Sequence, residues 1–471
     1  MKNIALIFVA VYIIIPSQVH SQNLSTQIDF LLQDSLLTVS QIAIDVYDLQ
    51  TEKYLYRKNE KLVLRPASNM KLLTTSAALF YLGEDADFET SFYTNGKVVD
   101  SVLIGDIIVK GGFDPLFTLK DFDTIIKKLK ISGVRKVEGN IYADVSEMDS
   151  LYFGKGWMWD DNPHSFNPYL SPLNINKNYV TIYFSPSQID SIAKVSLYPE
   201  SNFYTFENSL VTTNEDTSNV IVTRDWLNHS NRVIIKGDIS HNKGVDSAKV
   251  NIIDPHLFFI QLFSEQLNKN GIEFNGYTAL KEITDDFDTL YVKKRNIIDV
   301  IKNLNKESDN LGAEMLIRKL SSRFFPGSAS AEKGLRMIDS LVAALDYNPK
   351  TFVFADGSGL SHYNLISAEL IVDLLKYLYK KHPSVYSIIY ESLPIAGVDG
   401  TLKNRMRQFN LSKNIRAKTG TISGASTMSG YAKAANNHML AFSIFVQNYS
   451  GSARKARRIQ DEICKILASY K

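Results

Sequence analysis

Three short polar strings stand in a fixed order along the chain and are unequally spaced. Ser-Asn-Met-Lys begins at Ser68, Ser-Asp-Asn at Ser308 and Lys-Thr-Gly at Lys418. The first two starts are 240 residues apart, and the last two only 110. If the three strings serve one site, the fold must bring three distant segments together. It must also accommodate a large insertion between the first string and the second.

The Ser-x-x-Lys spacing alone selects no site, because it occurs five times, at Ser68, Ser191, Ser240, Ser330 and Ser452. Only the copy at Ser68 opens a mostly apolar run, over residues 70–82, that ends at Gly83. This run has a start signal and a stop signal and predicts a buried helix. The other copies lie in polar or turn-rich stretches or, at Ser452, beside a basic run.

Ser68 and Lys71 together have the chemistry of an activated nucleophile. A serine hydroxyl is a weak nucleophile until a base takes its proton, and a desolvated lysine near other cations can act as that base. Lys71 lies one turn further along the same helix face. The backbone N–H of Ser68, at a helix start, can stabilise a developing oxyanion. In the alternative interpretation, Ser68 only caps a buried helix and Lys71 extends to the surface.

The second string lies in a polar turn that runs into an amphipathic helix. The hydroxyl of Ser308 can relay a proton toward a leaving amine. The amide of Asn310 can both donate to and accept from a substrate peptide group. The alternative is an N-cap cluster, because Ser, Asp and Asn are the residues that most often cap helices.

The third string occurs once and lies in a predicted strand. On an edge strand beside Ser68, Lys418 would offer a positive charge and Thr419 a hydroxyl to a substrate carboxylate. Gly420 would let a substrate backbone approach closely, and the N–H of Thr421 would be the second oxyanion donor. Viewed alone, a plain strand and turn explains the string equally well.

The ordered set is the one known from β-lactamases and penicillin-binding proteins. From about residue 42 to 448, the chain resembles the low-molecular-mass class C penicillin-binding proteins, the D-alanyl-D-alanine carboxypeptidase/endopeptidase family. Further similar blocks lie at residues 105–115, 156–161, 171–176, 356–361 and 393–402. His362 stands where the resemblance implies an arginine.

The resemblance implies an α/β (α+β) fold: a penicillin-recognising, transpeptidase-like or β-lactamase-like domain with an antiparallel sheet flanked by helices. A large β-rich insertion splits this domain. The implied parts are residues 22–86 with 298–471 for the peptidase domain, 87–163 with 252–297 for an inserted domain, and 164–251 for a second, nested β-rich domain. Short alternating runs at residues 179–184 and 232–235 agree with a β-rich insertion.

The resemblance also implies a serine DD-peptidase that acts on peptidoglycan stem peptides and is acylated by β-lactam antibiotics. Cleavage of D-amino-acid cross-links is a second expected activity. The implied catalytic residues are Ser68, Lys71, Ser308, Asn310 and Lys418. The implied substrate-binding residues are Thr419, Gly420 and Thr421, and the implied oxyanion donors are the backbone N–H groups of Ser68 and Thr421. A β-lactamase or esterase on the same scaffold and a catalytically silent peptidoglycan-binding protein are the alternatives.

Other chemistries find little support in the sequence. The eight histidines show no metal-ligand spacing, so no metal or other cofactor is expected. A Ser-His-Asp hydrolase is disfavoured because no Gly-x-Ser-x-Gly string follows a strand, and residues 357–359 are interpreted as a turn. The single cysteine, Cys464, lies in an apolar helical pattern and is expected to be a buried thiol.

Charge and length bear on nucleic-acid binding and on the number of domains. A formal net charge of +2 over 471 residues, without a basic stripe, gives no sign of nucleic-acid binding. The basic residues at 454–458 are expected on the solvated face of a terminal helix. The length allows about two to four domains.

The N-terminus predicts export. A positive start precedes an apolar run of twelve residues, 4–15, which is too short to span a bilayer. Pro16 then ends the run, and small residues follow, so residues 1–21 are expected to be a signal peptide cleaved near Ser21. We therefore expect a periplasmic or otherwise extracytoplasmic protein with no membrane span after cleavage. The sequence leaves the oligomeric state open.

Overall fold

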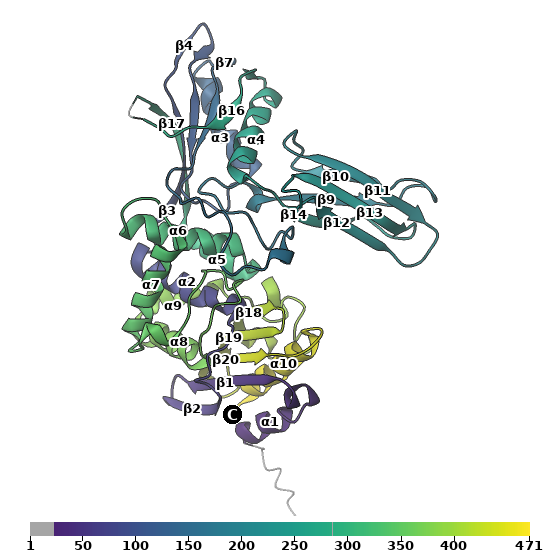
Figure 1. Ribbon diagram of the computed structural model, residues 1–471. Helices are drawn as coiled ribbons and strands as arrows, with labels where there is room; N and C mark the ends of the chain where they lie inside the picture. Colours follow the sequence, from purple (N-terminus) through teal and green to yellow (C-terminus); the bar gives the residue numbers. More distant parts are fainter. Residues whose placement is uncertain (1–22, 285) are drawn as a thin grey trace, which may run out of the picture.

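The computed structural model describes residues 23–284 and 286–471 (Figure 1). The signal peptide expected at residues 1–21 lies outside the described residues. Within the described part, none of the helices has the length and apolar character needed to cross a bilayer. A lower unit of sheet and helices carries an upper unit, from which a β-arm projects to one side (Figure 1).

The lower unit is built on a five-stranded antiparallel sheet in the order β18-β19-β20-β1-β2. Its strands are β1 (Gln41–Asp48), β2 (Lys53–Lys58), β18 (Ile415–Ile422), β19 (Ala425–Lys433) and β20 (Met439–Gln447). The hairpin expected at residues 42–56 and the closing pair of strands are both present. β19 and β20 are buried almost throughout, because helices cover both faces of the sheet.

Helices lie on both sides of this sheet. On one side, α8 (Ala368–Lys381) contacts β1, β19 and β20, and on the other, α1 (Leu24–Leu31) and α10 (Arg454–Ser469) pack together. The other helices of the lower unit pack with α8 around the largest hydrophobic core. They are α2 (Met70–Leu82), α5 (Ile297–Glu307), α6 (Asn310–Phe324), α7 (Ala331–Ala344) and α9 (Pro383–Ser392). Helix α2 is buried from Met70 to Leu79, which explains its apolar sequence.

The insertion leaves and rejoins the lower unit through two paired strands. β3 (Asp87–Thr94) and β17 (Asp288–Asn296) are antiparallel, and Asp87 at the entry pairs with Asn296 at the exit. They belong to a sheet in the order β16-β8-β6-β3-β17. Its other strands are β6 (Ile107–Lys110), β8 (Ile141–Asp144) and β16 (Thr278–Leu280). The paired ends explain how about 200 residues can be inserted with little disturbance of the host domain.

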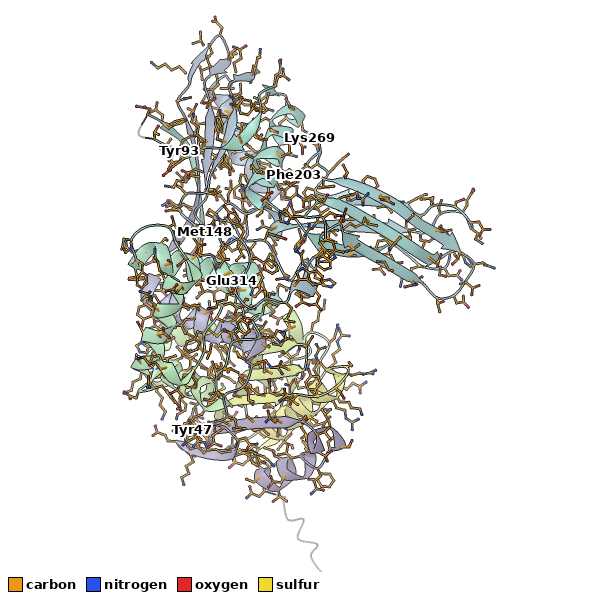
Figure 2. The ribbon with its side chains drawn as sticks, viewed as in Figure 1. Tyr47, Tyr93, Met148, Phe203, Lys269 and Glu314 are labelled. Carbon is orange, nitrogen blue, oxygen red and sulfur yellow. The ribbon has the colours of Figure 1, made fainter. Side chains whose placement is uncertain are left out.

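A second small sheet and two helices complete this part of the insertion. The strand order is β15-β7-β5-β4. The elements are β4 (Lys97–Val99), β5 (Val102–Ile104), β7 (Lys136–Glu138), β15 (Glu273–Phe274), α3 (Phe122–Ile131) and α4 (Pro255–Lys269). Met148 lies where this part meets the helices of the lower unit, and it bridges to Ala329 (Figure 2).

The β-arm contains two three-stranded sheets, in the orders β10-β9-β14 and β11-β13-β12. Its strands are β9 (Tyr179–Ser185), β10 (Lys194–Tyr198), β11 (Thr205–Thr213), β12 (Asn219–Arg224), β13 (Arg232–Ser240) and β14 (Asp246–Asn251). At its base Phe203 packs against Phe258 of α4, with ring centroids 5.3 Å apart (Figure 2). Buried side chains of both inserted parts form one continuous core. The domain division at residues 163 and 252 therefore stays a prediction.

Candidate active site

The three strings meet at one cleft of about 930 Å³ between β18, the start of α2 and the turn between α5 and α6. Ser68, Ser308, Asn310, Thr419 and Thr421 all line it. Lys71 and Lys418 lie beneath its floor, and both side chains are fully buried. The structure thus brings together residues that the sequence separates by 110 and 240 positions.

Ser68 lies in a 3-10 turn, Ala67–Asn69, that leads directly into α2. The preceding residue, Ala67, has a φ of 45°, a left-handed conformation that is unfavourable for alanine and concentrates at functional sites. Gly359 explains how this turn is held: a Cβ at that position would overlap the carbonyl group of Ala67. The turn fixes Ser68 at the helix start with its side chain half-exposed to the cleft.

Lys71 touches the groups that a base for Ser68 needs. Its Nζ donates to Ser68 Oγ at 3.0 Å, to Asn310 Oδ1 at 2.6 Å and to the Ser358 carbonyl at 2.5 Å. Burial lowers the pKa of the Lys71 ammonium to about 8. Three nearby carboxylates oppose this fall, those of Asp356, Asp309 and Glu314. Desolvation is thus the main reason why the pKa of Lys71 falls, and the nearby carboxylates limit that fall.

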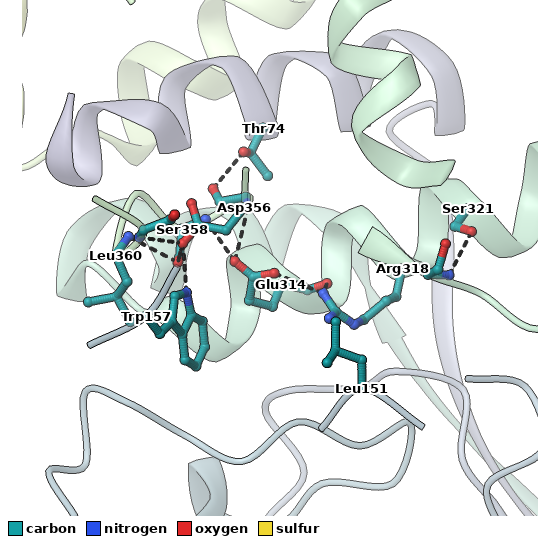
Figure 3. Close-up of polar contacts among 12 residues, drawn as sticks. Thr74, Leu151, Trp157, Glu314, Arg318, Ser321, Asp356, Ser358 and Leu360 are labelled. Atoms are coloured by element: carbon teal, nitrogen blue, oxygen red, sulfur yellow. Dashed lines mark hydrogen bonds and ion pairs between the residues drawn. The ribbon is translucent and has the colours of Figure 1, made fainter. Parts of the chain in front are cut away.

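A turn that the sequence left without a role holds the Ser358 carbonyl in place (Figure 3). Glu314 of α6 accepts from the N–H groups of Gly357 and Ser358 at 3.0 and 2.9 Å. The Asp356 carboxylate accepts from Trp157 Nε1 and Ser358 Oγ, both at 2.8 Å. Residues 357–359 do form a turn, as expected. Their carbonyl contact to Lys71 has no sequence signal, because every residue type carries that group.

The second string caps a helix and also lines the cleft. Ser308 has a left-handed backbone, with φ 58° and ψ 41°, that ends α5, and Asp309 caps α6 by accepting from Gly312 N–H. This geometry turns Ser308 and Asn310 toward the cleft. The Asn310 amide bridges two segments, because it accepts from Lys71 and donates to the Phe166 carbonyl at 2.6 Å.

The third string lies on β18, which is an edge strand beside Ser68, as expected. Lys418 Nζ donates to Ser308 Oγ at 2.8 Å and to the Thr419 carbonyl at 2.7 Å. Burial, together with the charge of Lys71, holds the pKa of Lys418 well below its usual range. The amine lies buried beside Ser308, and its predicted service to a substrate carboxylate stays a prediction.

Gly420 has a structural reason within the protein itself, and its predicted closeness to a substrate backbone stays a prediction. A Cβ there would lie 2.7 Å from the backbone N of Ser68 and would overlap Thr427 Oγ1. The close approach is therefore made by the protein's own Ser68 turn. The missing side chain brings β18 next to Ser68, where the N–H groups of Ser68 and Thr421 are the candidate oxyanion donors.

The sequence did not indicate that two arginines, Arg65 and Arg457, lie near the site. Arg65 lies beside position 362, with its Nη1 3.5 Å from His362 Nδ1, so a guanidinium is present next to the position where one was expected. Burial and the Arg65 charge lower the pKa of His362. Arg457, expected on a solvated helix face, lines the cleft and donates to Thr421 Oγ1 at 3.2 Å.

Comparisons with known proteins cover nearly the whole chain. A family model described as the D-Ala-D-Ala carboxypeptidase 3 (S13) family matches residues 24–470. The chain is 30% identical over 463 residues to a D-alanyl-D-alanine carboxypeptidase of Actinomadura sp., covering 95% of this chain and 85% of that protein. It is 28% identical over 391 residues to the D-alanyl-D-alanine carboxypeptidase DacB of Haemophilus influenzae, covering 82% and 80%.

A solved structure agrees with these matches. The crystal structure of penicillin binding protein 4 (dacB) from Haemophilus influenzae superposes with a TM-score of 0.82 at 26% identity, covering 94% of this chain and 99% of that chain. The expected fold, an antiparallel sheet flanked by helices with a β-rich insertion, is confirmed. Together with the motif cleft, the match over residues 24–470 shows that the chain belongs to the D-Ala-D-Ala carboxypeptidase 3 (S13) family.

Proposed function

We propose that the protein is an exported serine-type D-Ala-D-Ala carboxypeptidase that acts on peptidoglycan stem peptides through an acyl-enzyme at Ser68. The observation that carries this proposal is the 3.0 Å contact between Lys71 Nζ and Ser68 Oγ, inside a cleft that the other two strings also line. Membership of a carboxypeptidase family supports the reaction class.

In the proposed mechanism, Lys71 in its neutral form takes the proton of Ser68 Oγ as that oxygen attacks the carbonyl carbon of the penultimate D-Ala. The backbone N–H groups of Ser68 and Thr421 stabilise the oxyanion. Asn310 orients the substrate amide. The proton taken up by Lys71 is delivered through Ser308, assisted by Lys418, to the leaving amine, and the C–N bond breaks.

Water completes the cycle. Its oxygen attacks the Ser68 ester while neutral Lys71 takes its proton. Lys71 passes that proton to Ser68 Oγ as the ester C–O bond breaks, and the acyl group leaves as a shortened peptide. The same serine should open a β-lactam ring, because the ring amide occupies the place of the scissile bond. The neighbour in the solved structures is named a penicillin binding protein, which supports this extension.

Labelled benzylpenicillin tests the acyl-enzyme. Wild-type protein should become covalently labelled with one label per chain, and Ser68→Ala should not. A suitable matched control is Ser330→Ala, since Ser330 begins another Ser-x-x-Lys string and caps α7. Absence of wild-type labelling, or labelling that survives Ser68→Ala, would sink the assignment.

A diacetyl-Lys-D-Ala-D-Ala peptide separates the proposed function from its alternatives. Release of D-Ala supports the carboxypeptidase, whereas an intact peptide supports a silent binding protein. Rapid loss of the penicilloyl label without peptide cleavage supports a β-lactamase. Purified cross-linked muropeptides then measure the second proposed activity, cleavage of D-amino-acid cross-links, which stands if dimers are converted to monomers.

A further inference from the structure

The β-arm is joined to the active site by the wall segment, residues 161–167, which precedes it in the chain. Asp161 and Phe166 of this segment line the cleft. The Phe166 carbonyl accepts from Asn310 Nδ2 at 2.6 Å, and Asn310 Oδ1 accepts from Lys71 Nζ at 2.6 Å. A carbonyl can only accept, so this contact turns the NH2 end of the amide toward Phe166 and its oxygen toward Lys71. The wall segment therefore sets which way the amide of the second string faces.

Arg224, at the end of β12, ties the wall segment to the β-arm. Its Nη2 donates to Asn162 Oδ1 at 2.8 Å. Its Nε and Nη2 donate to Asn251 Oδ1 at 3.1 and 3.0 Å. Asn251, at the end of β14, in turn donates to the Asn167 carbonyl at 2.7 Å. Two side chains of the β-arm therefore hold the wall segment near both of its ends.

The Arg224 guanidinium is buried without a counter-charge. Arg224 is 1% exposed, and its Nη1 donates to the Ser230 carbonyl at 2.8 Å. Across residues 23–284 and 286–471, no carboxylate lies within ion-pair distance of this group. Burial of an unpaired charge costs the fold free energy, and an apolar side chain of similar size would avoid that cost. A planar guanidinium, however, holds several oxygens in fixed directions, which an apolar side chain cannot do. Stability alone therefore does not explain Arg224.

The wall segment also has backbone contacts to the β-arm. His164 bridges to Val250 of β14, and the Asn251 N–H donates to the Pro163 carbonyl at 2.9 Å. These contacts do not depend on the guanidinium, so removal of Arg224 should loosen the wall segment without releasing it. The expected result is a folded protein in which the carbonyl that receives the second string is less well placed. A small displacement of a positioning group lowers a rate even when the reacting groups are intact.

We propose that Arg224 is a positioning residue for the acylation of Ser68. It holds the wall segment so that the Phe166 carbonyl keeps the Asn310 oxygen turned toward Lys71. This inference rests on the proposed peptidase function and adds the β-arm to it, as a part of the fold that the active site requires. In a loosened wall segment the Asn310 amide can turn, and its NH2 end would then face Lys71 Nζ with donors opposed. Acylation slows although the nucleophile and its base are both present.

The rate constant of acylation at saturating labelled benzylpenicillin tests the proposal, because it reports the rate per active site and not the amount of folded protein. Arg224→Met should lower this constant by about ten- to thirtyfold, the effect of one hydrogen bond lost from a placed amide. The final extent of labelling should equal that of wild type. Arg224→Lys should recover part of the rate, since an ammonium can still hold one amide oxygen. The matched control is Arg232→Gln, at an exposed arginine of the same arm that pairs with Asp225, and it should acylate at the wild-type rate.

A double-variant cycle shows whether Arg224 acts through Asn310. Asn310→Ala alone should slow acylation. Arg224→Met added to it should slow acylation by less than about twofold more, because the amide to be positioned is already gone. Losses that multiply in full would contradict the proposal, since a general effect on the fold does not depend on Asn310.

The outcomes are separable. A wild-type rate constant in folded Arg224→Met would overturn the positioning role and leave the peptidase intact. Wild-type protein that takes up no label would instead overturn the proposed function. Circular dichroism shows whether each variant is folded. If Arg224→Met is unfolded, Asn162→Ala decides, because it removes one oxygen that the guanidinium holds. It should slow acylation by about two- to fivefold, and an unchanged rate constant would count against the proposal.

Discussion

The regions around Lys71 and Lys418 bury two amines in one cleft and surround them with different charges. Both side chains are fully buried, so desolvation lowers both pKa values. Around Lys71, carboxylates limit the fall and leave its pKa at about 8. Around Lys418, the neighbouring charge is the ammonium of Lys71, which lowers its pKa further. Burial is thus shared, and the neighbouring charges act on the two pKa values in opposite directions.

This difference assigns different tasks to the two amines. A general base works best when its pKa lies near the operating pH, and Lys71 meets this condition. At pH 7 a group with a pKa of about 8 is about one-tenth neutral, enough to accept the Ser68 proton and to return it. Lys418, whose Nζ lies 2.8 Å from Ser308 Oγ, is suited to a hydrogen-bonded relay with Ser308.

Removing Lys71 should have the largest effect. We expect Lys71→Ala to lower the second-order rate constant for penicillin acylation by about 10³- to 10⁴-fold, since the base that contacts Ser68 is lost. Rapid-quench labelling with fluorescent penicillin measures this constant. Lys333→Ala, in the Ser-x-x-Lys string that begins at Ser330, is the matched control and should acylate at the wild-type rate. Near-normal acylation of Lys71→Ala would transfer the role of base to another group.

Removing Lys418 should have a smaller effect, of about 10²-fold on the same constant, because Lys418 acts through Ser308 and does not contact Ser68. Ser308→Ala should show a similar loss, and the double variant should lose little more, since the two residues form one relay. A double-variant cycle on acylation rates checks this coupling. Losses that multiply, or a Lys418→Ala defect larger than that of Lys71→Ala, would reverse the comparison.

The sequence predicted the strings but not the environment that distinguishes the two lysines. Serine, lysine and asparagine at motif spacing are visible in one dimension, and so is the apolar helix that Ser68 opens. The Ser358 carbonyl is invisible there, because a backbone group has no residue signature. Arg457 is exposed on α10, as expected, but its place beside the cleft could not be predicted, because that depends on how α10 packs against the sheet. The charge of the site is therefore a property of tertiary packing.

In the fold, too, strand pairs that are close in sequence could be predicted, and parallel pairs joined by long connections could not. Alternating residues predicted the hairpin of β1 and β2 and the closing strands, which are neighbours in sequence. The parallel pairing of β6 with β8, and of β11 with β13, gave no such signal. Parallel partners are joined through long crossovers, so their register is set by contacts that a single sequence does not display.

The pH dependence of acylation should follow Lys71. The rate should rise with pH through about 8, because the neutral amine is the base and the ammonium is not. Asp309→Asn removes one charge that raises the Lys71 pKa and retains a good capping residue for α6. In this variant the rise of the acylation rate constant with pH should therefore occur at lower pH. Its value at high pH should be unchanged, and its value at pH 7 should increase by less than about tenfold.

Rate constants for labelled penicillin between pH 5.5 and 10, roughly the range over which a lysine of this kind titrates, would reveal the shift. Asp299→Asn is the control, because Asp299 is exposed in the first turn of α5 and does not contribute to the Lys71 pKa. If the pH at which the acylation rate constant rises is unchanged in Asp309→Asn, or is higher, the carboxylates around Lys71 do not set its protonation.

The smallest expected effect concerns the turn that presents the Ser358 carbonyl to Lys71. In Trp157→Phe the buried ring is largely kept, but the Nε1–H that donates to Asp356 is lost. The carboxylate keeps other donors, among them Ser358 Oγ at 2.8 Å and the Gly359 N–H at 2.8 Å. We therefore expect a loss of about 1–3 kcal/mol in the free energy of unfolding, the usual range when a buried acceptor loses one partner.

Acylation of Trp157→Phe should slow by less than about tenfold, because Lys71 keeps its own contacts and only the support of one carbonyl is loosened. Denaturant unfolding and labelled penicillin measure the two quantities on the same sample. Trp159→Phe is the control on the same loop, since that side chain is 68% exposed and should change neither value. A stability loss with unchanged acylation would make the turn purely structural. A fall in acylation as large as that of Lys71→Ala would mean that the position of the Ser358 carbonyl, and not the carboxylate charges alone, separates Lys71 from Lys418.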